Sequence, residues 1–159
     1  MWTVEIHAGD LKLVRRTSLD GLNWSAPLIG SVMGLEEGRR PWHIDVIQEQ
    51  ERLSAVLVSC IGLGGSGARL HYAYSEDHGL TWLAGDFLVE QSYEFEANIQ
   101  YRATLRKAQE NPHLYELWYS ASSLTNVFSI AYMKLVREGN SVVPYEARPT
   151  DIETLTSVQ

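Results

Sequence analysis

The sequence has 159 residues, of which 45% are hydrophobic and 21% charged, so it suits one domain with a hydrophobic core. This composition excludes a disordered tail, and the single cysteine, Cys60, excludes an intrachain disulfide. The formal net charge of −7 argues against generic binding to nucleic acid or to an anionic membrane, because both need clustered positive charge. With no run of about 18 apolar residues and no signal-peptide pattern, we expect a soluble chain that is cytoplasmic, secreted or part of a virion.

Short β-like runs separated by turn residues follow one another along the chain, and no segment has the pattern of an amphipathic helix. The expected strands are Trp2–His7, Leu11–Arg16, Trp42–Gln48, Leu53–Cys60, Arg69–Tyr74, Ile99–Lys107, Leu114–Ser120 and Phe128–Leu135. The polar segment Glu49–Arg52 is expected to be a turn, and Val143–Gln159 a final edge strand with a tail. The pattern indicates an all-β fold.

A short motif occurs twice at a fixed distance. Ser75–Trp82 repeats Ser18–Trp24, and the aspartates of the two copies lie 57 residues apart. The strand before the motif recurs as well, because Ala73-Tyr74 returns 58 residues later as Ala131-Tyr132. A period of this length with about four strands per unit is what a blade of a β-propeller requires.

Each copy of the motif is interpreted as part of the fold. An aspartate carboxylate accepts hydrogen bonds from backbone N–H groups of its own turn, a glycine supplies a positive φ, and the tryptophan packs back under the hairpin. We therefore expect a structural role, and no acid/base role, for Ser18, Asp20, Gly21 and Trp24 in the first copy and Ser75, Asp77, Gly79, Thr81 and Trp82 in the second.

With these motifs the chain resembles Asp-box β-propellers. Ser75–Trp82 matches the pattern S-x-D-x-G-x-T-W at each fixed position, and Ser18–Trp24 departs from it by one deletion and by Asn23. The motif is typical of sialidase-like six-bladed propellers, whereas the unit length, with Pro41–Asp45 and Tyr101-Arg102, resembles five-bladed glycoside hydrolases of the arabinanase and fructosidase type. The resemblance implies a partial β-propeller of four-stranded antiparallel blades, with the Asp boxes on hairpins far from the ligand site.

The repeat divides the chain into units of unequal completeness. We expect an incomplete first blade without its inner strand at 1–40, a second blade at 41–92, a third blade at 93–150 and a tail at 151–159. An open stack of blades leaves unpaired strand edges and an uncovered core face. The chain is therefore expected to be part of a longer protein, or to associate with another copy or partner.

The candidate site is expected on the first strand of each blade, because these strands line the central channel in which propellers bind ligands. Strict alternation places His43 and Asp45 on one face, and Gln100, Arg102 and Thr104 on the equivalent face of the next blade. A structural alternative is that Asp45 and Arg102 form a buried ion pair that closes the channel.

The resembled enzymes use carboxylates on these strands, which makes Asp45 the first catalytic candidate and Glu94 and Glu96 weaker ones. The aromatic side chains of Trp42 and Tyr101 are expected either to stack on sugar rings or to pack between blades. The candidate ligand-binding residues are Trp42, His43, Tyr101 and Arg102.

Neither a metal nor a cofactor is expected. The five histidines lack ligand spacing, and the glycine-rich segment Gly62–Gly67 is followed by a strand pattern where a nucleotide site needs a helix. We expect a carbohydrate-binding or structural propeller module of glycoside-hydrolase ancestry. The alternatives are a fragment or subunit of a glycoside hydrolase, inactive by itself because Arg102 stands where a second acid is needed, and a protein–protein scaffold.

Overall fold

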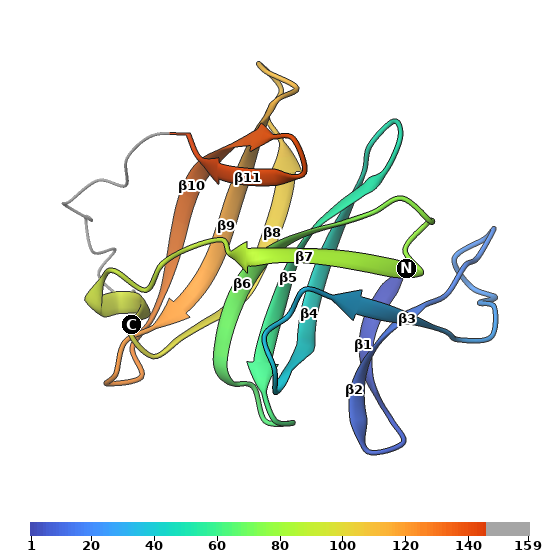
Figure 1. Ribbon diagram of the computed structural model, residues 1–159, viewed down its shortest axis with the longest axis horizontal. Helices are drawn as coiled ribbons and strands as arrows, with labels where there is room; N and C mark the ends of the chain where they lie inside the picture. The colour runs from blue at the N-terminus through green and yellow to red at the C-terminus, as the bar shows by residue number, and fades with distance from the viewer. Residues whose placement is uncertain (146–159) are drawn as a thin grey trace.

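A computed structural model describes residues 1–145, which form eleven strands and one short 3-10 helix and confirm the all-β class (Figure 1). The first seven strands are β1 (Trp2–His7), β2 (Asp10–Arg15), β3 (Leu28–Met33), β4 (Arg39–Gln48), β5 (Leu53–Ile61), β6 (Ser66–Ser75) and β7 (Thr81–Phe87). The helix η1 (Glu94–Glu96) then precedes β8 (Ile99–Lys107), β9 (Leu114–Ser122), β10 (Phe128–Glu138) and β11 (Ser141–Pro144). No helix in this part of the chain is long and apolar enough to cross a membrane.

The strands form two sheets. A seven-stranded sheet has the order β1-β2-β3-β7-β6-β5-β4, and a four-stranded sheet has the order β11-β10-β9-β8. Within β1–β3, β4–β7 and β8–β11, strands that follow one another along the chain pair antiparallel, whereas β3 and β7 pair parallel through Ser31–Met33 and Thr81–Leu83. This parallel pairing joins the first two expected units into a single sheet. Figure 1 shows the four-stranded sheet, coloured yellow to red, beside β4–β6.

All eight strands expected from the sequence are present, six of them with shifted ends, and two further strands complete the seven-stranded sheet. These are β3 and β7, which hydrophobic alternation did not reveal. Most β3 side chains are exposed, and β7 contains Gly85-Asp86. Of the expected edge strand and tail, β11 occupies Ser141–Pro144, and residues 146–159 lie outside the described part of the chain.

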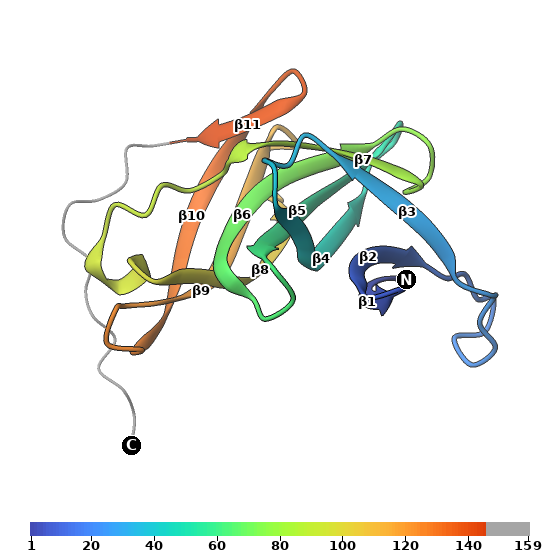
Figure 2. The same cartoon turned by 60° about the horizontal axis from the view of Figure 1, so that its bottom comes forward.

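The core consists of two hydrophobic clusters, one on each face of β4–β7. The first lies between β5–β6 and the four-stranded sheet, and contains Val56, Val58, Leu70, Tyr72, Leu105, Tyr115, Leu117 and Tyr119. The second lies between β4–β7 and the hairpin β1–β2, and contains Leu13, Ala55, Leu57, Ala73 and Trp82 (Figure 2). Because β5 is covered on both faces, eight of its nine residues are buried, which explains its unbroken apolar sequence.

The two repeated motifs form the same aspartate-centred turn. Asp77 Oδ1 accepts hydrogen bonds from the backbone N–H groups of Leu80 (3.0 Å) and Thr81 (2.8 Å). Asp20 Oδ1 accepts the corresponding bonds from Leu22 and Asn23, both at 2.8 Å. The glycine that follows in each turn has a positive φ, 73° at Gly21 and 85° at Gly79. Each carboxylate therefore stabilises its own turn.

The tryptophans of the two turns differ in their surroundings. Each indole N–H donates to a carbonyl of its own turn, at 3.1 Å for Trp24 and 3.2 Å for Trp82. Trp82 is fully buried because Trp2 of β1 packs edge-on against it, with 6.2 Å between ring centroids. Trp24 is 43% exposed, so the expected packing of a tryptophan under the hairpin holds only for the second copy.

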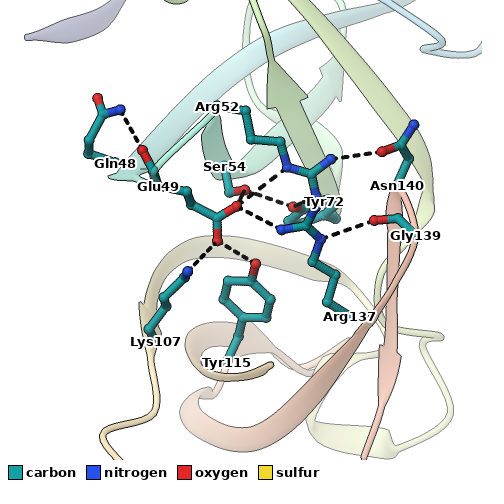
Figure 3. A network of polar contacts seen from close by, with 10 residues as sticks. All are labelled: Gln48, Glu49, Arg52, Ser54, Tyr72, Lys107, Tyr115, Arg137, Gly139 and Asn140. Carbon is teal, nitrogen blue, oxygen red and sulfur yellow. Dashed lines mark hydrogen bonds and ion pairs between the residues drawn. The ribbon is translucent and has the colours of Figure 1, made fainter. Parts of the chain in front are cut away.

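A buried carboxylate, Glu49, connects the two sheets (Figure 3). It forms ion pairs with Arg52 at 3.4 Å, Lys107 at 3.1 Å and Arg137 at 3.2 Å, and accepts a 2.6 Å hydrogen bond from the Tyr115 hydroxyl. The segment 49–52 is the turn expected from the sequence. Its first and last residues are nevertheless buried, because they turn inward to this network.

Candidate functional site

A cleft of about 560 Å³ lies where the hairpin β1–β2, the strand β4 and the strand β8 meet. Its lining consists of Trp2, Thr3, Val4, Leu11, Trp42, His43, Ile44, Asp45, Arg102, Ala103 and Thr104. Among these lining residues Asp45 is the only carboxylate and Arg102 the only permanent cation. The expected channel strands β4 and β8 therefore do lie side by side and share one concave site.

Both strands carry a β-bulge where they enter the cleft. The pairing of β4 with β5 shifts between Pro41 and His43, and the pairing of β8 with β9 shifts between Gln100 and Ala103. A bulge sets two residues against one on the partner strand, which breaks the alternation of faces. Strict alternation was therefore wrong for Gln100. Its side chain is buried away from the cleft and its amide donates to the Val89 carbonyl at 3.0 Å.

Asp45 holds the two expected channel strands together. Its Oδ2 accepts a 2.7 Å hydrogen bond from the Thr104 hydroxyl and a 3.0 Å hydrogen bond from the backbone N–H of Leu105. The expected ion pair with Arg102 is not among the ion pairs formed by residues 1–145, because these β8 donors bind the carboxylate instead. Oδ1 has no hydrogen-bond partner in this part of the chain, and Asp45 is one of the residues that line the cleft.

Arg102 lies on the cleft as a cation without a carboxylate partner. Within residues 1–145 every other arginine except Arg15 forms an ion pair. Its guanidinium is exposed and lies 5.8 Å from the Tyr101 ring centroid. Next to it, burial and then the positive charge of Arg102 lower the pKa of His43, whose Nε2 is buried and has no hydrogen-bond partner among the described residues. The lowered pKa favours the neutral imidazole of His43 at neutral pH.

The two candidate stacking residues separate in the structure. Trp42 lines the cleft and its indole packs against Gly65, where an added Cβ would lie 3.1 Å from the ring. Tyr101 is not among the lining residues. Its ring packs edge-on against His43 and Phe128, with 5.1 Å and 6.5 Å between ring centroids. Tyr101 therefore contacts the cleft residue His43 without lining the cleft itself.

The two glutamates considered as acids, Glu94 and Glu96, both lie on η1 and do not line the cleft. Glu94 is exposed to solvent. Glu96 is fully buried, where it accepts hydrogen bonds from the Tyr119 hydroxyl at 2.9 Å and from the Gln100 amide at 3.3 Å. The structure does not bring either glutamate together with Asp45.

The contribution of the first hairpin was missed by sequence reasoning. Trp2, Thr3 and Val4 of β1 and Leu11 of β2 form one wall of the cleft. The repeat assigns β1 to a unit without an inner strand, so nothing in the sequence pattern pointed to this wall. The described residues contain no cluster of three or more side chains suited to hold a metal ion.

Several solved structures share this fold. A thermostable family-43 glycoside hydrolase has a TM-score of 0.63, with 10% identity over 97% of this chain and 54% of its own. An N-acetylgalactosamine deacetylase from F. plautii, solved in complex with blood group B trisaccharide, has a TM-score of 0.61, with 19% identity over 78% of this chain and 41% of its own. A further glycoside hydrolase has a TM-score of 0.58 and 12% identity, and the match covers 96% of this chain and 58% of its own.

These matches show a distant structural similarity to glycoside hydrolases over most of the chain, at the level of the fold. The chain spans about half the length of the structures it matches. No model of a known protein family matches the sequence, and no curated protein is similar enough to count as a relative.

Proposed function

We propose that this chain is a carbohydrate-binding module with the architecture of part of a β-propeller and with glycoside-hydrolase ancestry. The observation that carries the proposal is the cleft between β1–β2, β4 and β8, in a chain whose fold resembles glycoside hydrolases. It combines an indole face at Trp42, a carboxylate oxygen of Asp45 and the unpaired guanidinium of Arg102. Aromatic faces suit the C–H side of a sugar, and charged donors and acceptors suit its hydroxyl groups.

The proposed blades follow the boundaries that the repeat suggests, with an incomplete first blade at 1–40, a second at 41–92 and a third at 93–150. The antiparallel arrangements β4–β7 and β8–β11 are the two four-stranded units. The aspartate-centred turns are then Asp boxes, between β2 and β3 and between β6 and β7. This assignment includes association with another chain, which covers the faces and edges of the open stack.

A glycoside hydrolase subunit is the second candidate. Hydrolysis by this class requires two carboxyl groups that flank the scissile bond. Asp45 is the only carboxylate among the lining residues, and Glu96 is committed to its own buried hydrogen bonds. The cleft therefore supports binding better than hydrolysis by this chain alone.

Binding of oligosaccharides tests the proposal, with a glycan array of neutral and acidic sugars followed by calorimetry on the sugars retained. We expect Arg102→Gln to weaken binding by about 10-fold or more, because a hydrogen bond to a charged group contributes roughly 1.5–3 kcal/mol. The matched control is Arg15→Gln, which removes the other described arginine without an ion pair and lies outside the cleft.

Asp45→Asn provides a second variant, since an amide keeps an oxygen that accepts from Thr104 and Leu105. Weaker binding in both cleft variants, with Arg15→Gln unchanged, is the expected result. Failure of the native chain to retain any sugar would contradict the carbohydrate-binding role and favour the scaffold alternative. Release of reducing ends from a retained sugar would favour the hydrolase instead.

A further inference from the structure

An apolar patch covers the face of the four-stranded sheet that points away from β4–β7. We call it the aromatic face, and it consists of Trp118 on β9 and of Phe128, Ile130 and Tyr132 on β10. The three β10 side chains alternate along the strand and are 59%, 74% and 48% exposed. Trp118 pairs with Tyr132 across the strands, with 5.0 Å between ring centroids. Exposed patches of this kind mark sites of association in soluble proteins.

The chain itself shows what covers the equivalent face of the preceding unit. The 58-residue offset relates Phe128, Ile130 and Tyr132 to three residues of β6, namely Leu70, Tyr72 and Tyr74. Those residues pack into the cluster that β8, β9 and β10 cover, where Tyr72 lies 6.2 Å from the ring of Tyr115. In the preceding unit, this face is therefore covered by the apolar face of a second β-sheet.

The outward side of the hairpin β1–β2, at the opposite end of the described chain, is polar. On the hairpin β1–β2, the side away from Trp2 and Val4 carries an ion pair between Glu5 and Arg16, and Thr3 and His7 also bond to the Glu5 carboxylate. Head-to-tail contact of this side with the aromatic face would bury these charges against aromatic rings, which is costly. Apolar against apolar is the favourable pairing.

Two ion pairs lie at the end of the aromatic face that holds Trp118 and Tyr132. Arg106 is paired with Glu116 and lies over the Trp118 ring, 4.8 Å from its centroid, whereas Lys134 is paired with Glu110 at the end of the patch. A polar margin around an apolar centre is the usual layout of a protein interface. Because these charges are already paired within the chain, contact between two aromatic faces leaves no charge without its partner.

We propose that a second copy of this chain covers the aromatic face with its own aromatic face, in a two-fold symmetric dimer. Such an interface uses the same patch on both subunits, and sheets stack with their apolar faces about 10 Å apart. The inference deepens the association named in the proposed function and does not depend on sugar binding. The two can therefore fail separately.

Light scattering on the full chain tests the dimer. We expect a mass of twice 18.0 kDa for the native protein and of 18.0 kDa for Ile130→Lys, since a buried lysine charge at the centre of the patch disfavours association. Ile6→Lys is the matched control, because Ile6 is 64% exposed on β1, outside the aromatic face, and this variant keeps the dimer. Circular dichroism verifies that each variant is folded, and Tyr132→Ser replaces Ile130→Lys if that variant does not fold.

Crosslinking fixes the geometry of the dimer. In an Ile130→Cys variant the native Cys60 is buried, so a short bis-maleimide reacts at position 130 and joins two copies through their aromatic faces. A Lys12→Cys variant, on the charged side of the first hairpin, is expected to remain uncrosslinked. A monomeric native chain at every concentration overturns the proposal and assigns the face to a different occupant. A dimer that Ile130→Lys leaves intact, or that crosslinks through position 12, overturns it as well.

Discussion

The tryptophans of the two aspartate-centred turns make the same local bonds but differ in burial, because the residues around them differ. In both turns the aspartate, the glycine and the indole N–H make the same local bonds. Only Trp82 has another tryptophan, Trp2, packed against it. A Cβ at Gly79 would collide with the indole of Trp2, so that glycine is required by close packing as well as by its positive φ.

Replacement of the two tryptophans should separate local from tertiary effects. We expect Trp82→Ala to lower the free energy of unfolding by about 3–5 kcal/mol, because it empties a fully buried site between β1 and β7. Trp24→Ala, at an exposed position, should cost less than about 1 kcal/mol. Chemical denaturation measures both values, and equal losses would contradict the difference in packing.

Asp77 should make the stability of the fold sensitive to acid. Burial acts to raise the pKa of its carboxyl, but the hydrogen bonds from Thr81 and Ser75 outweigh burial and lower the pKa from 3.8 to about 2. The folded state therefore gains stability from the ionised carboxyl above pH 3.8 and loses it as the pH falls towards 2.

Asp77→Asn should reduce this loss, because the amide keeps an acceptor oxygen and does not titrate. The comparison is the slope of unfolding free energy against pH between pH 5 and 2 for the native and variant proteins, roughly the range over which a lowered carboxyl pKa acts. Equal slopes for the two proteins would contradict a contribution of Asp77 to the loss of stability in acid. Hydrogen bonds from Arg16 and Thr3 also lower the pKa of Glu5 to about 2, so part of the acid sensitivity remains in the variant.

At the scale of elements, the bulges in β4 and β8 decide which side chains share the cleft. Each bulge adds one residue to its strand. With these bulges, Asp45 lies within hydrogen-bond distance of Thr104, and the side chain of Gln100 lies on the buried side of β8. Counting by twos along a strand predicts faces only where pairing is regular. A bulge has no reliable sequence signal here, and the error at Gln100 follows from that.

The network around Glu49 is the polar contact that joins the two sheets at one end. We expect Glu49→Ala to destabilise the fold by about 3–5 kcal/mol, because it leaves the buried Arg52 without its counter-ion. Glu36→Gln is the control, since Glu36 pairs with Arg39 at an exposed position and its loss should change stability little. Thermal unfolding compares the two, and an unchanged Glu49→Ala midpoint would show that the sheets do not need this network.

At the scale of the whole molecule, the strands differ widely in how firmly they are held. β5 is buried on both faces between two paired neighbours, whereas β3 is largely exposed and pairs with β7 over only three residues. Local stability follows burial and pairing.

Amide hydrogen exchange followed by mass spectrometry should show this gradient. We expect the amides of β5 and β6 to exchange slowest and those of β3 to exchange first, because most β3 side chains are exposed and β3 contributes only Val32 to the packing of a hydrophobic cluster. The measurement needs no variant. Protection of β3 equal to that of β5 would indicate that the seven-stranded sheet opens as one unit.

The sequence by itself was enough for the all-β class, for eight of the strands and for the placement of β4 and β8 along one cleft. The hydrophobic pattern of a strand is a local property of its residues, and the 57-residue repeat is a similarity between two segments of the same chain. Both can therefore be recognised in a single sequence. Tertiary structure alone decided the wall that Trp2 adds to the cleft, the burial of Glu49 and the displacement of Gln100 by a bulge. Each of these depends on contacts between segments distant in the chain, whose register no local pattern records.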